Sequence, residues 1–541
     1  MKLFHTQKYQ KNKMYNFNKK YNEYDECIAR GACSISPSLS AVQETLLVII
    51  RQCAFYINKL RSLEKTTSQE EVNLINMFAD AISSTAYNDS KITGMIKTAY
   101  QKLDSLRKKY QEKCKVLNLP KSDIKDKIYI PHDSNLSQII ALGEKYFHQR
   151  CKQEPKDKKN LTDLLILIIK NTAENLLSLY EYNTEDNNTV DAILNSLDLL
   201  NKTKVQPNTI NEWILNLVQL NLNLIEKLYR LQKERFGPID KTTVNLSTRS
   251  GHAILVSGTN LNDIYNLLEF TKNENIDIYT HDNLIIAHGF QNIKKYKNLI
   301  GHFGNCTENC ILDFAVFPGA ILITRNSNIN TDYLYRGRIF TTAAITPQVA
   351  VTIKNNDFSK LLVSAKEAKG FAKGQSKPTE IIGFNQTELE EKFKLLKEKT
   401  ENKEIKNIVI LDCSGGKSEY FENLTKKLSK TCYVLSFSYN TDRENSLVIN
   451  CGNNQPLIWK VMMTLNKYIP INDEKIFYVF SKCDSRTISN MIHLNSIGAK
   501  NIILSNCSPN AINPSLKKYI TENYCIKNAS TPDEDFKTLI I

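Results

Sequence analysis

The sequence lacks any apolar run of the roughly 18–20 residues that a membrane-spanning helix needs. It also lacks the pattern of a secretory signal, because its first segment, MKLFHTQKYQKNKMYNFNKKYNEYDE, is basic and polar without an apolar centre. We therefore expect no membrane association and a cytoplasmic location. At 541 residues the chain is too long for one hydrophobic core, and its apolar fraction of 41% is ordinary for globular domains.

No helix-turn-helix, zinc-finger or RNA-binding signature accompanies the net charge of +14. The N-terminal arm does interleave lysines with aromatic residues, a combination that can bind single-stranded nucleic acid. Such binding would weaken steeply as salt is added. We favour a solvated arm instead, so nucleic acid is not an expected partner. The residues concerned are Lys2, Lys8, Lys11, Lys13, Lys19 and Lys20 with Phe4, Tyr9, Tyr15, Phe17 and Tyr21.

The thirteen cysteines do not have the pattern of a disulfide framework. Their number is odd, their spacings are wide, and the expected compartment is reducing. Metal binding, reactive thiols and ordinary buried cysteines remain as explanations for them.

Hydrophobic periodicity divides the chain into a front part and a rear part. In the front, segments such as NLTDLLILIIKNTAENLLSLYEY place apolar residues at three- and four-residue spacings, which predicts a helical bundle. Behind Phe236, short apolar runs alternate with amphipathic helices, as in parallel-sheet α/β domains. We therefore predict an α + α/β architecture. Its parts are a basic arm over 1–38, a helical bundle domain over 39–240, and α/β domains over 250–400 and 405–541.

Open α/β sheets bind ligands beyond the carboxyl ends of their strands, so the residues that follow each apolar run are candidates. Four cysteines occupy such positions, although a small apolar cysteine also packs well there. The cysteines are Cys413, Cys451, Cys483 and Cys507, and the other candidates are Thr259, His281, Asn283, Asn326, Ser327, Ser438, Tyr439 and Asp484.

Cys413 is the strongest of these candidates. It lies in LDCSGGKSEYFENLTKKL, where a predicted strand, a Gly-Gly turn and a helix follow one another. A helix N-terminus favours an anion and lowers the pKa of a thiol, which makes a thiolate available as a metal ligand or nucleophile. The segment is not a Walker A loop, because the spacing G-x-x-x-x-G-K-[ST] is absent.

Two close pairs of cysteines lie elsewhere. Cys27 and Cys33, in ECIARGACSISP, precede the first long helix. Close-set thiols in a glycine-containing loop can wrap an iron–sulfur cluster, but two thiols do not complete a four-cysteine site. Cys306 and Cys310, in GNCTENC, fit one face of a turn, and an incidental pair at a helix start is an equally good interpretation.

Several motifs together resemble the hybrid cluster proteins, or prismane proteins, which are hydroxylamine reductases related to nickel–iron carbon monoxide dehydrogenases. CIARGAC resembles the second half of that family's N-terminal cluster motif. The resemblance runs from Cys27 through nearly the whole chain, and it implies a helical domain followed by two Rossmann-like domains. The implied activity is reduction of hydroxylamine or nitric oxide. The main motifs are HAILVSGTNLNDIYNLLEFTKNENIDIYTHDNLIIAHGF, KYKNLIGHFGN, DFAVFPGAILITRNSNI, YRGRIFTT and RTISNMIHLNSIGAKNIILSNCSPNAINP.

The resemblance implies a hybrid cluster held by one histidine, two glutamates and four cysteines, with a lysine nearby. This sequence departs from that set, because only the persulfide-bearing cysteine is retained, as Cys413. Threonine, asparagine and serine are poor iron ligands, so we expect that the standard hybrid cluster is lost or rebuilt. The histidine, first glutamate and three cysteine positions fall on Thr259, Asn283, Ser327, Tyr439 and Asn454, and the second glutamate and the lysine on Asp484 and Arg486.

The favoured function is that of a divergent iron–sulfur protein in redox chemistry or electron transfer. We expect a [4Fe–4S] cluster that bridges a homodimer through Cys27 and Cys33 of each chain, as in carbon monoxide dehydrogenases, and an electron-transfer partner. In a reductase, Cys413 would be the central thiolate, Asp484 an acid or base, and Arg486 a fixed cation. The alternative is a non-catalytic relative that binds a partner or small anion. The thiols available for a rebuilt centre are Cys306, Cys310, Cys451, Cys483 and Cys507.

Overall fold

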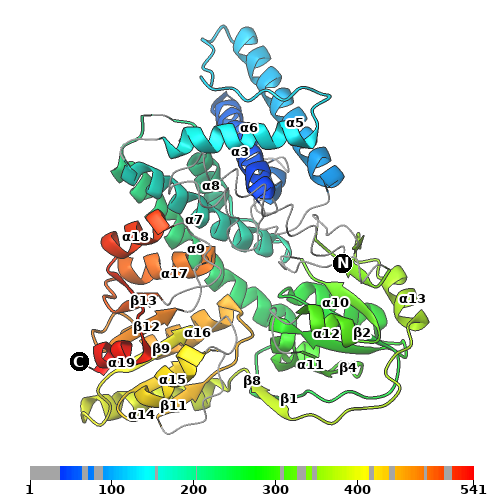
Figure 1. Ribbon diagram of the computed structural model, residues 1–541, viewed down its shortest axis with the longest axis vertical. Coiled ribbons are helices and arrows are strands. Elements are labelled where there is room, and N and C mark those ends of the chain that lie inside the picture. Colours follow the sequence, from blue (N-terminus) through cyan, green and yellow to red (C-terminus); the bar gives the residue numbers. More distant parts are fainter. Residues whose placement is uncertain are drawn as a thin grey trace, which may run out of the picture.

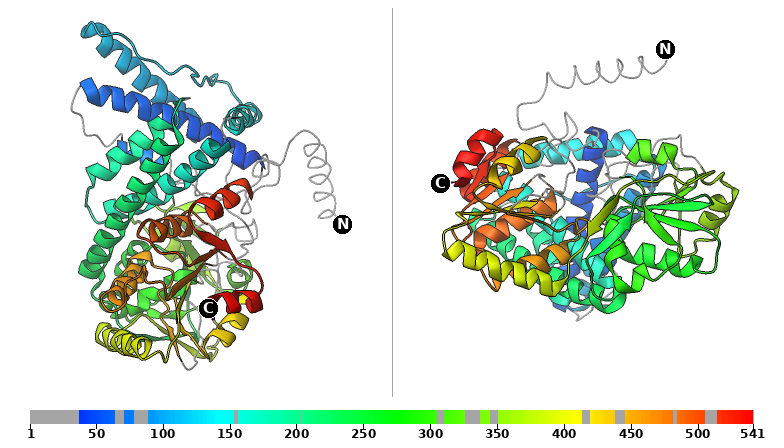
Figure 2. Two further views of the ribbon diagram at one scale, coloured as in Figure 1. Left: turned by 90° about the vertical axis from the view of Figure 1, so that its left-hand side faces the viewer. Right: turned by 90° about the horizontal axis from the view of Figure 1, so that it is seen from below.

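Long helices form one end of the molecule and two α/β domains lie side by side at the other (Figure 1). The right-hand view of Figure 2 shows the two sheets next to each other when seen from below. This arrangement confirms the predicted α + α/β architecture. The computed structural model describes residues 37–63, 71–77, 89–152, 156–202, 204–304, 310–325, 337–343, 350–412, 419–437, 445–480, 484–504 and 514–540.

The helical part is built around two long helices, α7 (Lys156–Tyr180) and α9 (Pro207–Phe236), which pack against each other. Helix α9 begins at a proline, whose missing N–H is not needed in the first turn. It ends before Gly237, whose φ of +79° suits a residue without a side chain. The other helices are α3 (Pro37–Leu63), α5 (Asp89–Val116), α6 (Leu136–Cys151) and α8 (Asn187–Leu199), with a further helical turn over 71–77.

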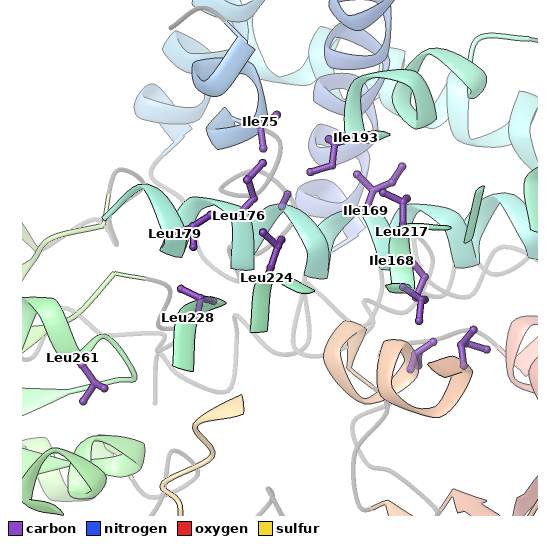
Figure 3. Packing of buried hydrophobic residues seen from close by; sticks show 14 of the residues in the cluster. Ile75, Ile168, Ile169, Leu176, Leu179, Ile193, Leu217, Leu224, Leu228 and Leu261 are labelled. Carbon is purple, nitrogen blue, oxygen red and sulfur yellow. The ribbon is translucent and has the colours of Figure 1, made fainter. Parts of the chain in front are cut away.

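A dense apolar core joins α7, α8 and α9 (Figure 3). Ile169 and Leu176 of α7, Leu217 and Leu224 of α9, and Ile193 of α8 are all fully buried. Each such side chain stabilises the fold by about 1.5–3 kcal/mol relative to an exposed position. The helical part is therefore held together by the apolar periodicity from which it was predicted.

Six described strands form the sheet of the first α/β domain, and all of their pairings are parallel. Their order, β4-β3-β2-β5-β6-β7, corresponds to the Rossmann order 3-2-1-4-5-6. Strands β3 and β4 are added on one side of β2, and β5, β6 and β7 on its other side. The carboxyl ends of β2 and β5 are therefore the expected ligand site. The strands are β2 (Ala253–Ser257), β3 (Asp277–His281), β4 (Leu299–His302), β5 (Ala320–Ile323), β6 (Ile339–Thr341) and β7 (Val351–Thr352).

Helices surround this first sheet, and a separate two-stranded antiparallel sheet contacts it at β4. The pair, which the sequence did not predict, joins β1 (Thr242–Asn245) to β8 (Thr379–Ile382). The helices are α10 (Leu261–Thr271), the 3-10 helix η2 (Asp282–Gly289), α11 (Gln291–Lys294), α12 (Cys310–Val316) and α13 (Ser359–Glu367), and α14 (Gln386–Glu401) leads to the next domain.

The second α/β domain repeats the same topology. Its six described strands are parallel in the order β11-β10-β9-β12-β13-β14, so its switch point lies between β9 and β12. The strands are β9 (Ile408–Asp412), β10 (Tyr433–Ser436), β11 (Ser446–Val448), β12 (Ile476–Phe480), β13 (Ile502–Leu504) and β14 (Ile526–Asn528). The helices are α15 (Glu419–Leu428), α16 (Gln455–Asn466), α17 (Ser485–Ser496), α18 (Pro514–Asn523) and α19 (Pro532–Ile540).

Helix α9 ties the three parts together, because it also contacts α16, α17 and α11 of the two α/β domains. Its last residue, Phe236, packs against the rings of Tyr265 and Phe290 in the first α/β domain. Among the described helices, none combines the length and the apolarity that a membrane crossing requires.

The packing of α9 predicts a contrast between two leucines of that helix. Leu217 is fully buried, whereas Leu215 is 38% exposed. We expect L217A to lower the free energy of unfolding by about 2–5 kcal/mol through lost burial and an unfilled cavity. The matched variant L215A should change it far less. Urea unfolding followed by circular dichroism measures both, and equal losses would contradict the assigned packing.

Candidate functional site

At the first switch point, the loop after β2 is hydrogen-bonded to the end of β5. At the end of β5, the Thr324 hydroxyl accepts hydrogen bonds from the backbone N–H groups of Thr259 (3.2 Å) and Asn260 (3.3 Å). The Asn260 side chain caps α10 by accepting from the N–H of Asp263 (2.9 Å). The loop after β2 therefore lies against β5, and Thr259, at the family's histidine position, is at the surface.

Glu181, in the turn after α7, reaches into this switch point from the helical part. Its carboxylate accepts hydrogen bonds from the side-chain amides of Asn260 (2.9 Å) and Asn262 (3.0 Å). It also pairs with the guanidinium of Arg325 at 3.3 Å, which follows β5 and is 46% exposed. The protein's own polar groups thus occupy the carboxyl ends of β2 and β5.

Asp263 is a buried carboxyl group at the centre of the same cluster. It accepts hydrogen bonds from the Arg325 backbone N–H (2.9 Å) and from the Thr342 hydroxyl (2.6 Å). Burial, and then the negative charge of Glu181, raise the pKa of Asp263 to about 6. The group therefore titrates close to neutral pH.

The two α/β domains touch at Asn283, the family's first glutamate position. Asp282 before it has a φ of +56°, a conformation that few residues other than glycine adopt. The Asn283 amide donates a hydrogen bond to the Asp282 carboxylate (3.0 Å). A Cβ atom on Gly452 of the second domain would lie 2.3 Å from the Asn283 carbonyl oxygen. Glycine at that position is what allows the contact.

The second domain brings Arg486 to the same loop. Its Nη1 donates to the carbonyl oxygen of Asn453 (3.0 Å), next to Gly452. Asp484, two residues earlier, caps α17 by accepting from the N–H of Thr487 (2.8 Å). The structure therefore gathers Asn283, the loop over 451–454 and Arg486, while Thr259 lies at the other switch point with Glu181.

Only some of the cysteines predicted as ligands lie among the described residues. Cys451 is fully buried, and desolvation raises the pKa of its thiol. Cys310 begins α12. The roles assigned to these two cysteines, to Asp484 and to Arg486 stay predictions. Cys27, Cys33, Cys306, Cys413, Cys483, Cys507, Asn326, Ser327, Ser438 and Tyr439 lie outside the described residues.

His281, the one histidine predicted at a strand end, is engaged within the core. Its Nδ1 is hydrogen-bonded to the Ser257 hydroxyl (2.8 Å), and its Nε2 lies 3.2 Å from the carboxylate of Asp313. Within the described part of the chain, no group of three or more His, Cys, Asp or Glu side chains is placed to hold a metal ion.

Sequence reasoning missed three members of the polar cluster, namely Glu181, Asp263 and Arg325. Arg325 carried a usable signal, because it directly follows the apolar run AILIT that predicted β5. Glu181 carried none, since it belongs to the helical part and meets the sheet only through the tertiary fold.

The raised pKa of Asp263 predicts a specific pH dependence. The unfolded chain releases this proton near pH 4 and the folded chain near pH 6, so ionisation opposes folding. As the pH rises from 4 to 7, Asp263 should lower the free energy of unfolding by about 2–3 kcal/mol. The D263N variant should not show this decrease in the free energy of unfolding.

Urea unfolding of the native protein and D263N at pH 4 and pH 7 measures the effect. The advantage of D263N over the native protein should grow with pH. D357N, which changes an exposed aspartate whose pKa is lowered, should gain nothing over the same interval. An identical pH dependence for native protein and D263N would contradict the burial of this carboxyl.

The chain is similar to several known proteins. The chain is 26% identical over 540 residues to a hydroxylamine reductase of Thermodesulfovibrio yellowstonii, covering 95% of this chain and 98% of the relative. It is also 26% identical to a hydroxylamine reductase of Gloeothece citriformis, covering 94% and 96%. A solved acetyl-CoA synthase/carbon monoxide dehydrogenase structure is similar at 10% identity with a TM-score of 0.47, covering 94% of this chain and 83% of that chain.

The family itself is matched over most of the chain. The pattern that defines the Prismane/CO dehydrogenase family covers residues 23–441, which is well over half of the sequence and includes parts of both α/β domains. This match spans the motifs on which the resemblance rests except the last, at 486–514, and the chain belongs to the Prismane/CO dehydrogenase family.

Proposed function

We propose that this chain is an iron–sulfur protein of redox or electron-transfer function whose deep site no longer holds the standard hybrid cluster. The observation that carries the proposal is the chemistry of two described positions. Where the family resemblance implies a histidine and a glutamate ligand, this chain has Thr259 and Asn283. A hydroxyl and an amide are weak donors to iron beside imidazole and carboxylate.

The surroundings of both positions support the same conclusion. The backbone N–H of Thr259 bonds to Thr324, and the Asn283 amide bonds to Asp282. The ion pair of Glu181 and Arg325 occupies the neighbouring strand ends. These donor groups do not fit a hybrid cluster, so no reaction step is assigned to one.

A separate cluster at the N-terminus is the second part of the proposal. Cys27 and Cys33 supply two thiols per chain, and a two-fold axis would bring four thiolates to one [4Fe–4S] cluster. This arrangement requires a homodimer and serves electron transfer to a partner protein. The relatives named hydroxylamine reductases support a redox function of this general kind.

The shared cluster predicts the iron content. Protein purified without oxygen should contain about two irons per chain, because one four-iron cluster serves two chains. It should absorb broadly near 400 nm, as iron–sulfur centres do, and elute as a dimer. C27S and C33S should each lose this absorption, whereas C525S, which changes an exposed cysteine, should keep it. Iron-free protein after anaerobic purification would refute the proposal.

The proposed loss of the hybrid cluster predicts the behaviour of Cys413. If no metal is bound in the deep site, C413S should leave the iron content unchanged, because the only cluster lies elsewhere. With a reduced viologen dye as electron donor, native protein and C413S should both consume hydroxylamine no faster than protein-free buffer that contains the same iron. Robust turnover that C413S abolishes, together with a drop in iron, would show that a deep cluster persists.

The alternative function, binding without catalysis, is separated by the same measurements. A non-catalytic relative that binds a small anion or a partner would contain no iron and would lack the absorption near 400 nm. That outcome would leave the scaffold without redox chemistry.

A further inference from the structure

A cavity of about 270 Å³ lies between α9 and the second α/β domain. Helices α16 and α17 and the ends of β9 and β12 complete its walls, which are mostly apolar. The volume exceeds that of a cavity of about 150 Å³ that binds benzene in another protein. Its apolar lining includes Ile225, Phe437, Trp459, Met462, Met463 and Phe480.

Three polar side chains that line this cavity each leave one buried nitrogen without a hydrogen-bond partner among the described residues. These atoms are Nε2 of Gln455, Nη2 of Arg486 and Nδ1 of His493. Two of the side chains are otherwise fixed in place. The Gln455 oxygen accepts from Asn175 (3.1 Å), and Arg486 Nη1 donates to Asn453 (3.0 Å). An unpaired buried donor is destabilising, and a ligand can satisfy it.

The three side chains come from two regions of the cavity wall. Arg486 donates to the carbonyl two residues before Gln455, so both residues lie near the start of α16. His493 lies two turns further along α17, roughly 10 Å away along the helix axis. Burial lowers the pKa of His493 to about 4, so its ring is neutral at pH 7. One end thus offers a cationic donor and the other a neutral imidazole.

The charges around the cavity define what fits. The guanidinium of Arg486 and the amide of Gln455 are both donors, and a carboxylate is an acceptor with two oxygens. Glu226 and Asp412 also line the cavity, and Glu226 is paired with Arg230. Arg486 is the only lysine or arginine that lines the cavity among the described residues, so a ligand carboxylate is expected to bind there.

We propose that this cavity binds a small, elongated carboxylate with an apolar body. The carboxylate lies at Arg486 and Gln455, the apolar body packs between Trp459 and Met462, and a polar atom at the far end meets His493. An aromatic acid with a single ring and a terminal hydroxyl has this length and polarity. The site shares Arg486 with the predicted deep site, but it does not depend on the proposed N-terminal cluster, which rests on Cys27 and Cys33.

The chain offers an internal reporter for this binding. It has two tryptophans, Trp213 on α9 and Trp459 in the cavity wall. In W213F, tryptophan fluorescence reports on Trp459 alone. We expect 4-hydroxyphenylacetate to change this fluorescence with saturation at one site per chain. Tyramine, which carries an ammonium group on a similar ring, should not bind, because Arg486 repels it.

Variants made in W213F test each end of the site. R486M should weaken binding of 4-hydroxyphenylacetate and of phenylacetate about tenfold or more, since a charged hydrogen bond is lost. H493L should weaken only 4-hydroxyphenylacetate, by severalfold, because phenylacetate has no group to meet His493. R249M removes an arginine from the other α/β domain and should leave both affinities unchanged. Circular dichroism verifies that each variant folds.

Clear outcomes would overturn the inference. They are the absence of a saturable change up to about 10 mM 4-hydroxyphenylacetate, equal binding of tyramine, or equal losses in R486M and R249M. Titrations with iron-free and iron-containing protein keep the two proposals apart. Missing iron refutes the redox function alone, and missing fluorescence change in both preparations refutes the ligand site alone.

Discussion

The burial of α9 is the constraint on which the rest of the structure depends. One side of this helix packs on α7, and another packs on α16 and α17 of the second α/β domain. At its end, Phe236 enters the aromatic cluster of the first α/β domain, with Tyr182 of the helical part beside it. One continuous apolar core therefore runs through all three parts. Both α/β domains are thus placed against the same helix, and they also contact each other directly where Gly452 meets Asn283.

Polar side chains gather at the carboxyl ends of the strands in the first α/β domain, where Glu181 of the helical part contacts the loop after β2. At the first switch point the cluster includes Asp263, whose ionised form is disfavoured by burial. The partly exposed pair of Glu181 and Arg325 contributes at most about 1 kcal/mol. The ionised form of Asp263 therefore opposes folding near neutral pH, and locally unfavourable groups of this kind occur at functional sites.

The sequence predicted those features that repeat within short segments. Apolar periodicity located the long helices, and buried apolar runs located β2, β3, β5 and most strands of the second sheet. Strands β4, β6 and β14 were not predicted, because their segments contain no more than two consecutive apolar residues. The contact between Asn283 and Gly452 could not be predicted either, since 169 positions separate the two residues in the chain. The family resemblance gave ligand positions, but only the fold showed which groups replace them.

The cavity beside α9 results from the way this helix packs on the second α/β domain. Helices that cross a sheet leave gaps, and apolar side chains usually fill them at close to crystal density. Here the gap stays open, and three of the side chains that line it each have a buried nitrogen without a hydrogen-bond partner among the described residues. Each unpaired donor costs about 1–3 kcal/mol. A fold that retains an open space and three such groups together gives up stability at one place, and a bound acceptor with an apolar body recovers it.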